Sequence, residues 1–178
     1  MPGTRRFSQR ISEGDGISII VCVDDAGGAE AAEAQGAEAV AVTQVIDGIR
    51  HATSLPLLWM GEGDPTDADA VLIRPGDEIG DAHETVVDVR DEEELELALE
   101  RLDPEIFLLN AHDIDDHVDP LDAVLELLPD VPAGKLAIAQ VDVATRDEVL
   151  ALERAGVDAV LVRARHVAEL VGDQPLDV

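Results

Sequence analysis

The sequence contains few basic residues, few aromatic residues and a single cysteine. Its 178 residues include 12 Lys and Arg against 40 Asp and Glu, a formal charge of −28, and 2% are aromatic. A polyanion would meet repulsion over most of this surface, so we expect no nucleic acid partner. The single cysteine, Cys22, excludes an intramolecular disulfide and a cysteine zinc site. No run approaches the roughly 20 apolar residues of a membrane helix, and the start lacks a secretory apolar block. We therefore expect a soluble, cytoplasmic protein with no membrane partner.

Lysine is nearly absent from the basic residues. Lys135 stands against eleven arginines, tyrosine does not occur, and 23 Asp outnumber 17 Glu. This balance is typical of proteins from a salt-in halophilic cytoplasm. At about 1 M salt the Debye length falls to about 3 Å, so carboxylates stop repelling one another across the surface but keep it hydrated. An ordinary acidic protein is the alternative, but it does not account for the loss of lysine.

Apolar residues are numerous enough for the core of one globular domain, since 46% of the chain is hydrophobic. They gather in short runs without polar alternation, which is typical of strands buried on both faces of a parallel sheet. Eight such runs occur, at Ile17–Val23, Ala39–Val42, Leu55–Met60, Ala70–Ile73, Thr85–Val89, Ile106–Leu109, Leu136–Ala139 and Ala159–Val162.

Helix signals separate several of these runs. Asp91 and Thr145 stand at N-cap positions with a glutamate three residues later, and Asp119 precedes a proline at the first helical position. Gly156 ends the helix that Thr145 begins. We expect helices over residues 25–35, 43–51, 92–102, 120–128, 146–155 and 166–171.

Strand and helix alternating eight times is the pattern of a (β/α)8 barrel. A recurring phrase, GAEAVAV, DADAVLI and GVDAVLV, fits a barrel built from similar units. Such barrels use about 250 residues and rarely fewer than about 200. The residues missing relative to a typical barrel fall in the connections 61–68 and 76–83, which are shorter than the roughly 10–12 residues of a helical crossover.

We therefore expect an α/β fold, a shortened (β/α)8 TIM barrel with the third and fourth helices reduced or missing. An open flavodoxin-like sheet is the alternative. Residues 1–178 are expected to form a single TIM-barrel domain, with a flexible N-terminal segment at 1–15, the barrel at about 16–172 and a C-terminal tail at 173–178.

Three stretches in the second half carry a family resemblance. The run VVDVRDEEELELAL at Val86–Leu99 resembles the fifth strand and helix of indole-3-glycerol phosphate synthases, VEVHDEEELxxAL. IFLLNAHDI at Ile106–Ile114 resembles their IGINNRDL, with Asn110 on the first asparagine. LAIAQVDV at Leu136–Val143, followed by AGVDAVLV at Ala155–Val162, is similar to VxESGI followed by GxDAVLIG.

The similarity follows the order of elements over about residues 17–172 and is specific over 84–163. Leu55–Ile73 is as similar to geranylgeranylglyceryl phosphate synthase, another phosphate-binding barrel with an abbreviated third helix. The nearer resemblance implies a ribulose-phosphate-binding barrel and a lyase reaction of tryptophan biosynthesis, ring closure with loss of CO2 and water. In that chemistry a lysine is the general acid, carboxylates assist, and glycine-rich loops after strands seven and eight hold the substrate phosphate.

This chain departs from the family at most of these positions. The Glu-x-Lys that ends strand one is Cys22–Val23–Asp24, and the Arg-Lys-Asp after strand three is Trp59–Met60–Gly61. On strand seven the glutamate is Gln140 and the phosphate-holding Ser-Gly is Val141–Asp142, while a glycine on strand eight is Arg163.

The strand-five glutamate is replaced by the shorter Asp88. Of the family's site residues, only Asn110 is retained unchanged. Gln140 cannot exchange a proton at pH 7 and Met60 cannot donate one, so the acid–base step loses its agents. Asp142 places an anion where backbone N–H groups should face a phosphate.

An anion site of another kind is available at the end of strand eight. Arg163 and Arg165 could together bind an anion, or they could pair with the neighbouring Asp88 or Asp142. The expected site therefore has Asp88 and Gln140 as degenerate equivalents of catalytic residues, and a ligand-binding set of Asp24, Trp59, Asn110 and Arg163.

Two of these residues have a structural alternative. Trp59 would stack on a ligand ring or would belong to the core, and Asp24 would position a ligand or would only help to open the following helix.

The loop Asn110–Asp119 is dense in His and Asp, and His112, Asp115 and His117 are weak candidates for a divalent metal site. A solvated acidic loop is the preferred interpretation, so no metal is expected. No cofactor is expected either, because Gly61–Pro65 lacks the spacing of a nucleotide-binding loop and its charge opposes one.

The main hypothesis is a synthase-like barrel that has lost the carboxy-lyase activity and retains at most the binding of a small anionic ligand at its C-terminal rim. The alternative is a non-catalytic scaffold or regulatory protein, with a homo-oligomer formed through the abbreviated side of the barrel. A further alternative is an active tryptophan-biosynthesis or prenyltransferase-like enzyme with a remodelled site.

Overall fold

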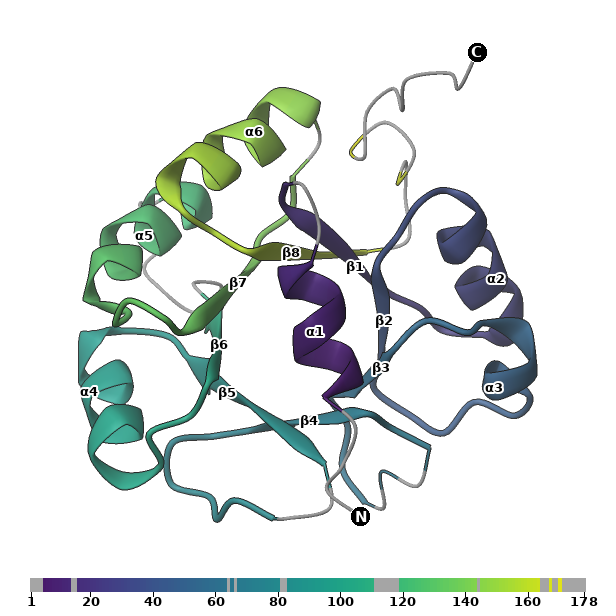
Figure 1. Ribbon diagram of the computed structural model, residues 1–178, viewed down its shortest axis with the longest axis horizontal. Helices are drawn as coiled ribbons and strands as arrows, with labels where there is room; N and C mark the ends of the chain where they lie inside the picture. Colours follow the sequence, from purple (N-terminus) through teal and green to yellow (C-terminus); the bar gives the residue numbers. More distant parts are fainter. Residues whose placement is uncertain are drawn as a thin grey trace.

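Eight parallel strands form a closed barrel in the computed structural model (Figure 1). Each strand pairs with the next along the chain, and β8 pairs with β1 over five residues. This last pairing closes the sheet, so the predicted barrel is confirmed and the open sheet is wrong. The strands are β1 (Ser18–Cys22), β2 (Ala39–Val42), β3 (Leu57–Trp59), β4 (Ala70–Ile73), β5 (Glu84–Val89), β6 (Ile106–Asn110), β7 (Leu136–Gln140) and β8 (Ala159–Arg163). The structure describes residues 5–13, 16–63, 65, 67–80, 83–110, 119–143, 145–163, 167 and 170.

Helices lie outside the ring of strands, except α1, which crosses one end of it (Figure 1). Their starts follow local signals: Asp91 Oδ1 accepts a hydrogen bond from Glu94 N at 2.8 Å, and Thr145 with Glu148 forms a complete capping box. No helix in the described ranges is long and apolar enough to cross a membrane. The helices are α1 (Arg6–Ser12), α2 (Ala26–Ala34), α3 (Ile49–Ala52), α4 (Glu92–Arg101), α5 (Pro120–Leu127), the 3-10 turn η1 (Leu128–Asp130) and α6 (Arg146–Ala155).

The connections before and after β4 contain no helix among the residues described there, as the short segments predicted. The outer face of β4 is less covered as a result. Its outward side chains Val71 and Ile73 are only half-buried, whereas Val87 and Val89 on β5 are 0% exposed.

The helix predicted over 43–51 is largely wrong. Only Ile49–Ala52 is helical, because Gly48 adopts a left-handed conformation with φ of +77° and turns the chain just before it. Val45, ahead of this turn, is 73% exposed. The helix predicted over 166–171 lies outside the described residues apart from the buried Val167 and Leu170.

Helix α1 closes the N-terminal end of the barrel. Phe7 is 0% exposed and Ile11 is 2% exposed, and both pack in the cluster of interior strand residues. The helix has no side-chain cap of its own, but Glu84 at the start of β5 accepts hydrogen bonds from Phe7 N at 2.8 Å and Ser8 N at 3.2 Å. Residues 6–12 therefore belong to the fold, which corrects the expectation of a flexible segment at 1–15.

Alternate residues of each strand face the barrel interior. The inward set fills the barrel, and the outward set packs beneath the helices. At the C-terminal ends of the strands, the last inward-facing residues surround one opening of the barrel, here called the mouth. TIM-barrel active sites form at this end. The inward set includes Ile20, Ala41, Leu58, Val86, Leu108, Ile138 and Leu161, with the less buried Cys22, Met60 and Leu72 against it.

Candidate functional site

Polar side chains from five strands meet at the C-terminal mouth of the barrel. Cys22, Asp88, Asn110, Gln140 and Arg163 all occupy inward-facing positions at the ends of their strands, on β1, β5, β6, β7 and β8. The register places Asn110 beside Gln140 and Cys22 beside Arg163. Four predicted site residues, Asp88, Asn110, Gln140 and Arg163, are thus brought to the same mouth.

Asp88 is one of two groups in this mouth, with Cys22, whose pKa is shifted. Burial raises the pKa of its carboxyl, and the charge of Glu94 raises it further. The guanidinium groups of Arg90 and Arg74 and a hydrogen bond with Asn110 act in the opposite direction without reversing the shift. Asp88 therefore keeps its proton to a higher pH than an ordinary aspartic acid, which is the behaviour of a group able to exchange protons.

Two buried oxygens in the mouth have no hydrogen-bond partner among the described residues. They are Asp88 Oδ1 and Gln140 Oε1. A buried acceptor without a donor costs about 1–3 kcal/mol. The fold tolerates this cost on β5 and again on β7, so the mouth offers two acceptors to a donor such as a hydroxyl or an amine.

Arg163 supplies a positive charge at the rim. Its side chain is exposed and has no carboxylate within 4 Å in the described part of the chain. The predicted pair with Asp88 or Asp142 is therefore not formed by Arg163 within the described residues, and Arg165 lies outside them. The guanidinium lies near Cys22, whose pKa is raised by burial and by Asp24 and lowered to a smaller extent by Arg163. The Cys22 thiol consequently stays protonated at neutral pH.

The remaining predicted residues lie elsewhere. Asp24 is exposed at the rim just beyond β1 and acts on the mouth through its charge. Trp59 is 5% exposed and packs in the outer cluster, beside a small hollow lined by Val42 and Ile49. The next residue, Met60, packs against the interior cluster instead. Trp59 is therefore a core residue between the barrel and its outer layer and does not line the mouth.

The weak metal candidates His112, Asp115 and His117 lie outside the described residues. Within the described ranges, no group of three His, Cys, Asp or Glu side chains is arranged to hold a metal ion.

Two further arginines belong to the mouth and were missed from the sequence. Arg74 follows β4 and Arg90 follows β5, each two residues beyond an inward-facing position. Glu94 holds Arg90 in place: its Oε2 accepts from the Arg90 backbone N–H at 2.8 Å, and its Oε1 accepts from a guanidinium N–H at 3.0 Å. The two-residue spacing along each strand is the signal that would have identified both arginines.

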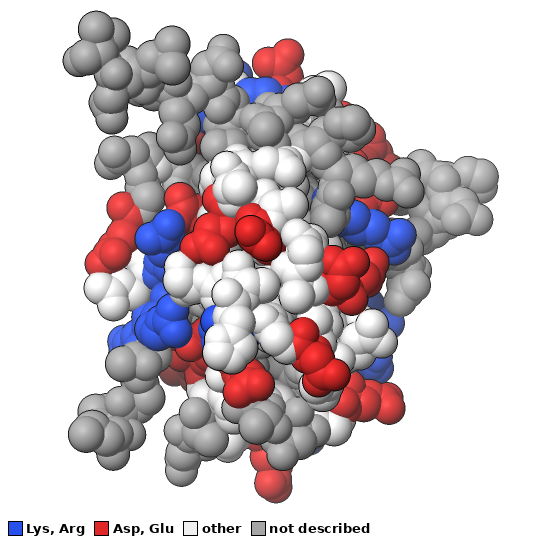
Figure 2. Space-filling view, turned by 90° about the vertical axis from the view of Figure 1, so that its right-hand side faces the viewer, with Lys and Arg blue, Asp and Glu red and all other residues white. Residues whose placement is uncertain are grey.

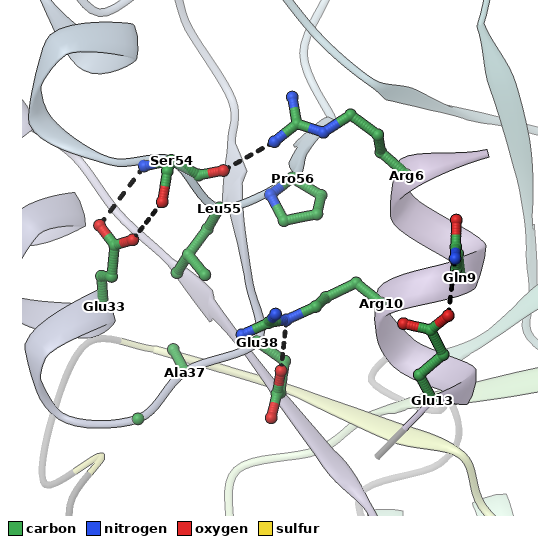
Figure 3. A pocket seen from close by; sticks show the side chains of 11 residues that line it. Arg6, Gln9, Arg10, Glu13, Glu33, Ala37, Glu38, Ser54, Leu55 and Pro56 are labelled. Carbon is green, nitrogen blue, oxygen red and sulfur yellow. Dashed lines mark hydrogen bonds and ion pairs between the residues drawn. The ribbon is translucent and has the colours of Figure 1, made fainter. Parts of the chain in front are cut away.

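A hollow of about 350 Å³ lies at the opposite, N-terminal end, between α1 and the start of β3 (Figure 3). Its charged groups already have partners. Arg6 donates to the carbonyl oxygen of Ser54 at 2.7 Å, Arg10 Nε lies 2.6 Å from Glu38 Oε2, and Ser54 Oγ donates to Glu33 at 2.5 Å. The bond from Ser54 is also the main reason that the pKa of Glu33 is lowered. This hollow joins α1 to the barrel and has no free group for a ligand.

Residues 80–167 match the sequence model of the indole-3-glycerol phosphate synthase family. Over this stretch the chain resembles that synthase. The indole-3-glycerol phosphate synthase of Variovorax paradoxus (strain S110) is 39% identical over 77 residues, 43% of this chain and 29% of that protein. The synthase of Geobacillus sp. (strain WCH70) is 32% identical over 79 residues, 44% of this chain and 31% of that protein. The aligned stretch thus spans less than a third of these curated relatives.

The fold has a wider match than the sequence. Thiamine phosphate pyrophosphorylase from Pyrococcus furiosus superposes with a TM-score of 0.65 over 86% of this chain and 90% of that one, at 17% identity. At that identity the likeness concerns the fold alone. The stretch matched to the synthase family contains β5 to β8, and hence five polar residues of the mouth: Asp88, Arg90, Asn110, Gln140 and Arg163.

Proposed function

We propose that this synthase-like barrel binds a small anionic ligand at its C-terminal mouth and does not carry out the synthase reaction. One arrangement supports the proposal most strongly. Arg163, which has no carboxylate partner in the described part of the chain, stands at the mouth that contains the buried oxygens of Asp88 and Gln140, which have no hydrogen-bond partner there either. The cation attracts an anion, and the two oxygens accept hydrogen bonds from its hydroxyl or amine groups.

The side chains present support the proposed loss of the synthase reaction. Gln140 stands where the family has a carboxylate and cannot transfer a proton at neutral pH. Met60, facing the interior where the family has a lysine, cannot act as an acid. Among the described side chains at the mouth, only the inward-facing Asp88 has a carboxyl pKa raised toward neutrality, and one carboxyl does not replace the family's acid and base together.

The binding proposal is tested by titrating the protein with inorganic phosphate in a calorimeter, in multimolar KCl. We expect binding to the native chain and a loss of at least about tenfold in Arg163→Gln, because a charge-assisted contact contributes about 1.5–3 kcal/mol. Arg154→Gln, an exposed arginine in the last turn of α6, is the matched control and should bind as the native chain does. Absence of phosphate binding, or equal binding by Arg163→Gln, would overturn the proposal.

A second candidate function is that of an interaction protein that forms a homo-oligomer through the abbreviated side. The supporting observation is the thin cover of β4, with Val45 73% exposed and Ile79 43% exposed on the neighbouring connections. Light scattering in multimolar KCl separates the candidates. A dimer that dissociates in Val45→Ser supports this function, and a monomer at all concentrations rules it out.

We also propose that the protein works in a high-salt cytoplasm. Acidic side chains are spread over the face that carries α2 and α3, and basic ones lie toward the edges of that view (Figure 2). At low ionic strength these carboxylates repel one another and oppose the compact state. The melting temperature should therefore rise steeply between dilute buffer and multimolar KCl, and an unchanged value would contradict this assignment.

A further inference from the structure

The last inward-facing residues of alternate strands form one layer at the bottom of the mouth. In a TIM barrel each interior layer takes four side chains, one from every second strand. On β1, β3, β5 and β7 this layer consists of Cys22, Met60, Asp88 and Gln140. Two positions earlier on the same strands the inward residues are all aliphatic: Ile20, Leu58, Val86 and Ile138. The layer therefore lies where the packed apolar interior gives way to polar groups.

Two oxygens in this layer lack a donor. Asp88 Oδ1 and Gln140 Oε1 are buried and have no hydrogen-bond partner among the described residues. The Asp88 carboxyl does bond with Asn110 on β6, but that bond leaves Oδ1 without a partner. Of the other two side chains in the layer, Met60 has no donor and the Cys22 thiol is a weak one. The missing donors have to come from a molecule that enters the mouth.

The number of donors on that molecule distinguishes an ammonium from a hydroxyl. A hydroxyl has a single O–H donor, so one hydroxyl satisfies one of the two oxygens and leaves the other without a partner. A primary ammonium has three N–H donors and no acceptor, so one such group serves both oxygens and brings no acceptor into a layer that already has two without a donor. The composition of the layer favours an ammonium.

The surroundings of Asp88 also favour the addition of a positive charge. Burial raises the pKa of its carboxyl and Glu94 raises it further, while the guanidinium groups of Arg90 and Arg74 oppose the shift without reversing it. The carboxylate is therefore less stable here than in water, and a proton or a bound cation stabilises it. Hydrogen bonds from an ammonium to both oxygens offset the hydration that the ammonium loses on entering. A neutral hydroxyl brings no compensating charge.

The positive charge of Arg163 lies farther out than the two acceptors. Its side chain is exposed at the end of β8, whereas Asp88 Oδ1 and Gln140 Oε1 are buried. The mouth thus presents acceptors at its bottom and a cation at its rim. A ligand that matches this order has its ammonium on the inside and its anionic group on the outside.

We propose that the mouth binds a zwitterionic ligand, with a primary ammonium group between Asp88 and Gln140 and an anionic group at Arg163. This proposal rests on the function proposed above and specifies the chemistry of its ligand. The ligand class is a short alkylamine that carries a phosphate or a carboxylate.

The test compares two ligands of nearly equal size by calorimetric titration at neutral pH and one KCl concentration. Aminoethyl phosphate and hydroxyethyl phosphate differ in whether an ammonium or a hydroxyl ends the chain, so the contribution of the phosphate cancels in the ratio of their dissociation constants. We expect the native chain to bind aminoethyl phosphate at least about tenfold more tightly, because hydrogen bonds between charged groups are stronger than those of a neutral hydroxyl.

Two substitutions locate the ammonium. Asp88→Asn keeps the shape of the side chain and removes its charge, and Gln140→Met removes the acceptor at nearly constant volume. In each variant the ratio of the two dissociation constants should fall toward one. Glu126→Gln is the matched control, since it removes one negative charge from an exposed position on α5, and it should keep the native ratio.

The outcomes separate this proposal from the function proposed above. If the native chain binds both ligands equally and Arg163→Gln loses both, the ammonium subsite is refuted and the proposed function stands. A preference for aminoethyl phosphate that persists in both Asp88→Asn and Gln140→Met also refutes the subsite. If neither ligand binds the native chain, both proposals are refuted.

Discussion

Replacing Phe7 with alanine tests whether α1 is the floor of the barrel. Phe7 is 0% exposed and contacts the interior cluster, which also forms the base of the mouth. Phe→Ala changes at such sites cost about 3–5 kcal/mol. The full cost is expected if α1 stays docked. If α1 detaches instead, the loss of stability cannot exceed the free energy that holds α1 on the barrel, and the denaturant m-value falls. The burial of Phe7 and Ile11 contributes about 1.5–3 kcal/mol each to that free energy.

The assay is urea unfolding followed by circular dichroism in multimolar KCl, since urea leaves the ionic strength unchanged. Gln9→Ala is the matched control, because Gln9 is exposed on the same helix and its loss should change stability by no more than about 0.5 kcal/mol. A Phe7→Ala variant within about 1 kcal/mol of the native chain, with an unchanged m-value, would refute the role of α1.

Three further changes test the site and the abbreviated side. The pKa of Asp88 is higher in the folded chain than in the unfolded chain, so ionisation of Asp88 lowers stability as the pH rises above the ordinary pKa of an aspartic acid. The stability of Asp88→Asn relative to the native chain should therefore increase from acid to neutral pH. A difference in urea midpoint that does not depend on pH would contradict this. A Cβ on Gly61 would overlap the backbone carbonyl oxygen of Thr43, so Gly61→Ala should cost roughly 1–3 kcal/mol. Gly76→Ala, in open space, should be neutral or slightly stabilising, and equal urea midpoints for the two variants would count against the close approach of Gly61 to Thr43. Asp69 accepts hydrogen bonds from the start of β3 and from α3, so Asp69→Ala should lower the free energy of urea unfolding by roughly 1.5–3 kcal/mol, and a change below about 0.5 kcal/mol would show that these bonds are dispensable.

The strands and most helices were predictable because their signals are local. Each strand is a run of mostly apolar residues, buried on both sides in all but β4, and the caps at Asp91 and Thr145 lie within the segments that they begin. Helix α1 carries no such signal, since its first N–H groups are satisfied by Glu84, 77 residues away from Phe7. A cap supplied by tertiary structure cannot be recognised from the neighbouring sequence.

The positions of the candidate site residues were predictable where the family resemblance reached them. Asp88, Asn110 and Gln140 lie within the resembling stretch and meet as it implied. Trp59 was misplaced because its run, LPLLWM, has no polar alternation to tell which of two adjacent residues faces inward; the pairing of β3 with β2 and β4 decides it. Arg74 was missed because it precedes the resembling stretch and its inward position depends on register.

The central claim is that this barrel retained a ligand mouth and lost the synthase reaction. It is tested most directly by incubating the protein with carboxyanilinodeoxyribulose phosphate in multimolar KCl and measuring indoleglycerol phosphate. With Gln140 and Met60 at the positions of the family's proton-transfer groups, we predict no product above a control without protein. Catalytic formation of indoleglycerol phosphate that is abolished in Asp88→Asn would contradict the account.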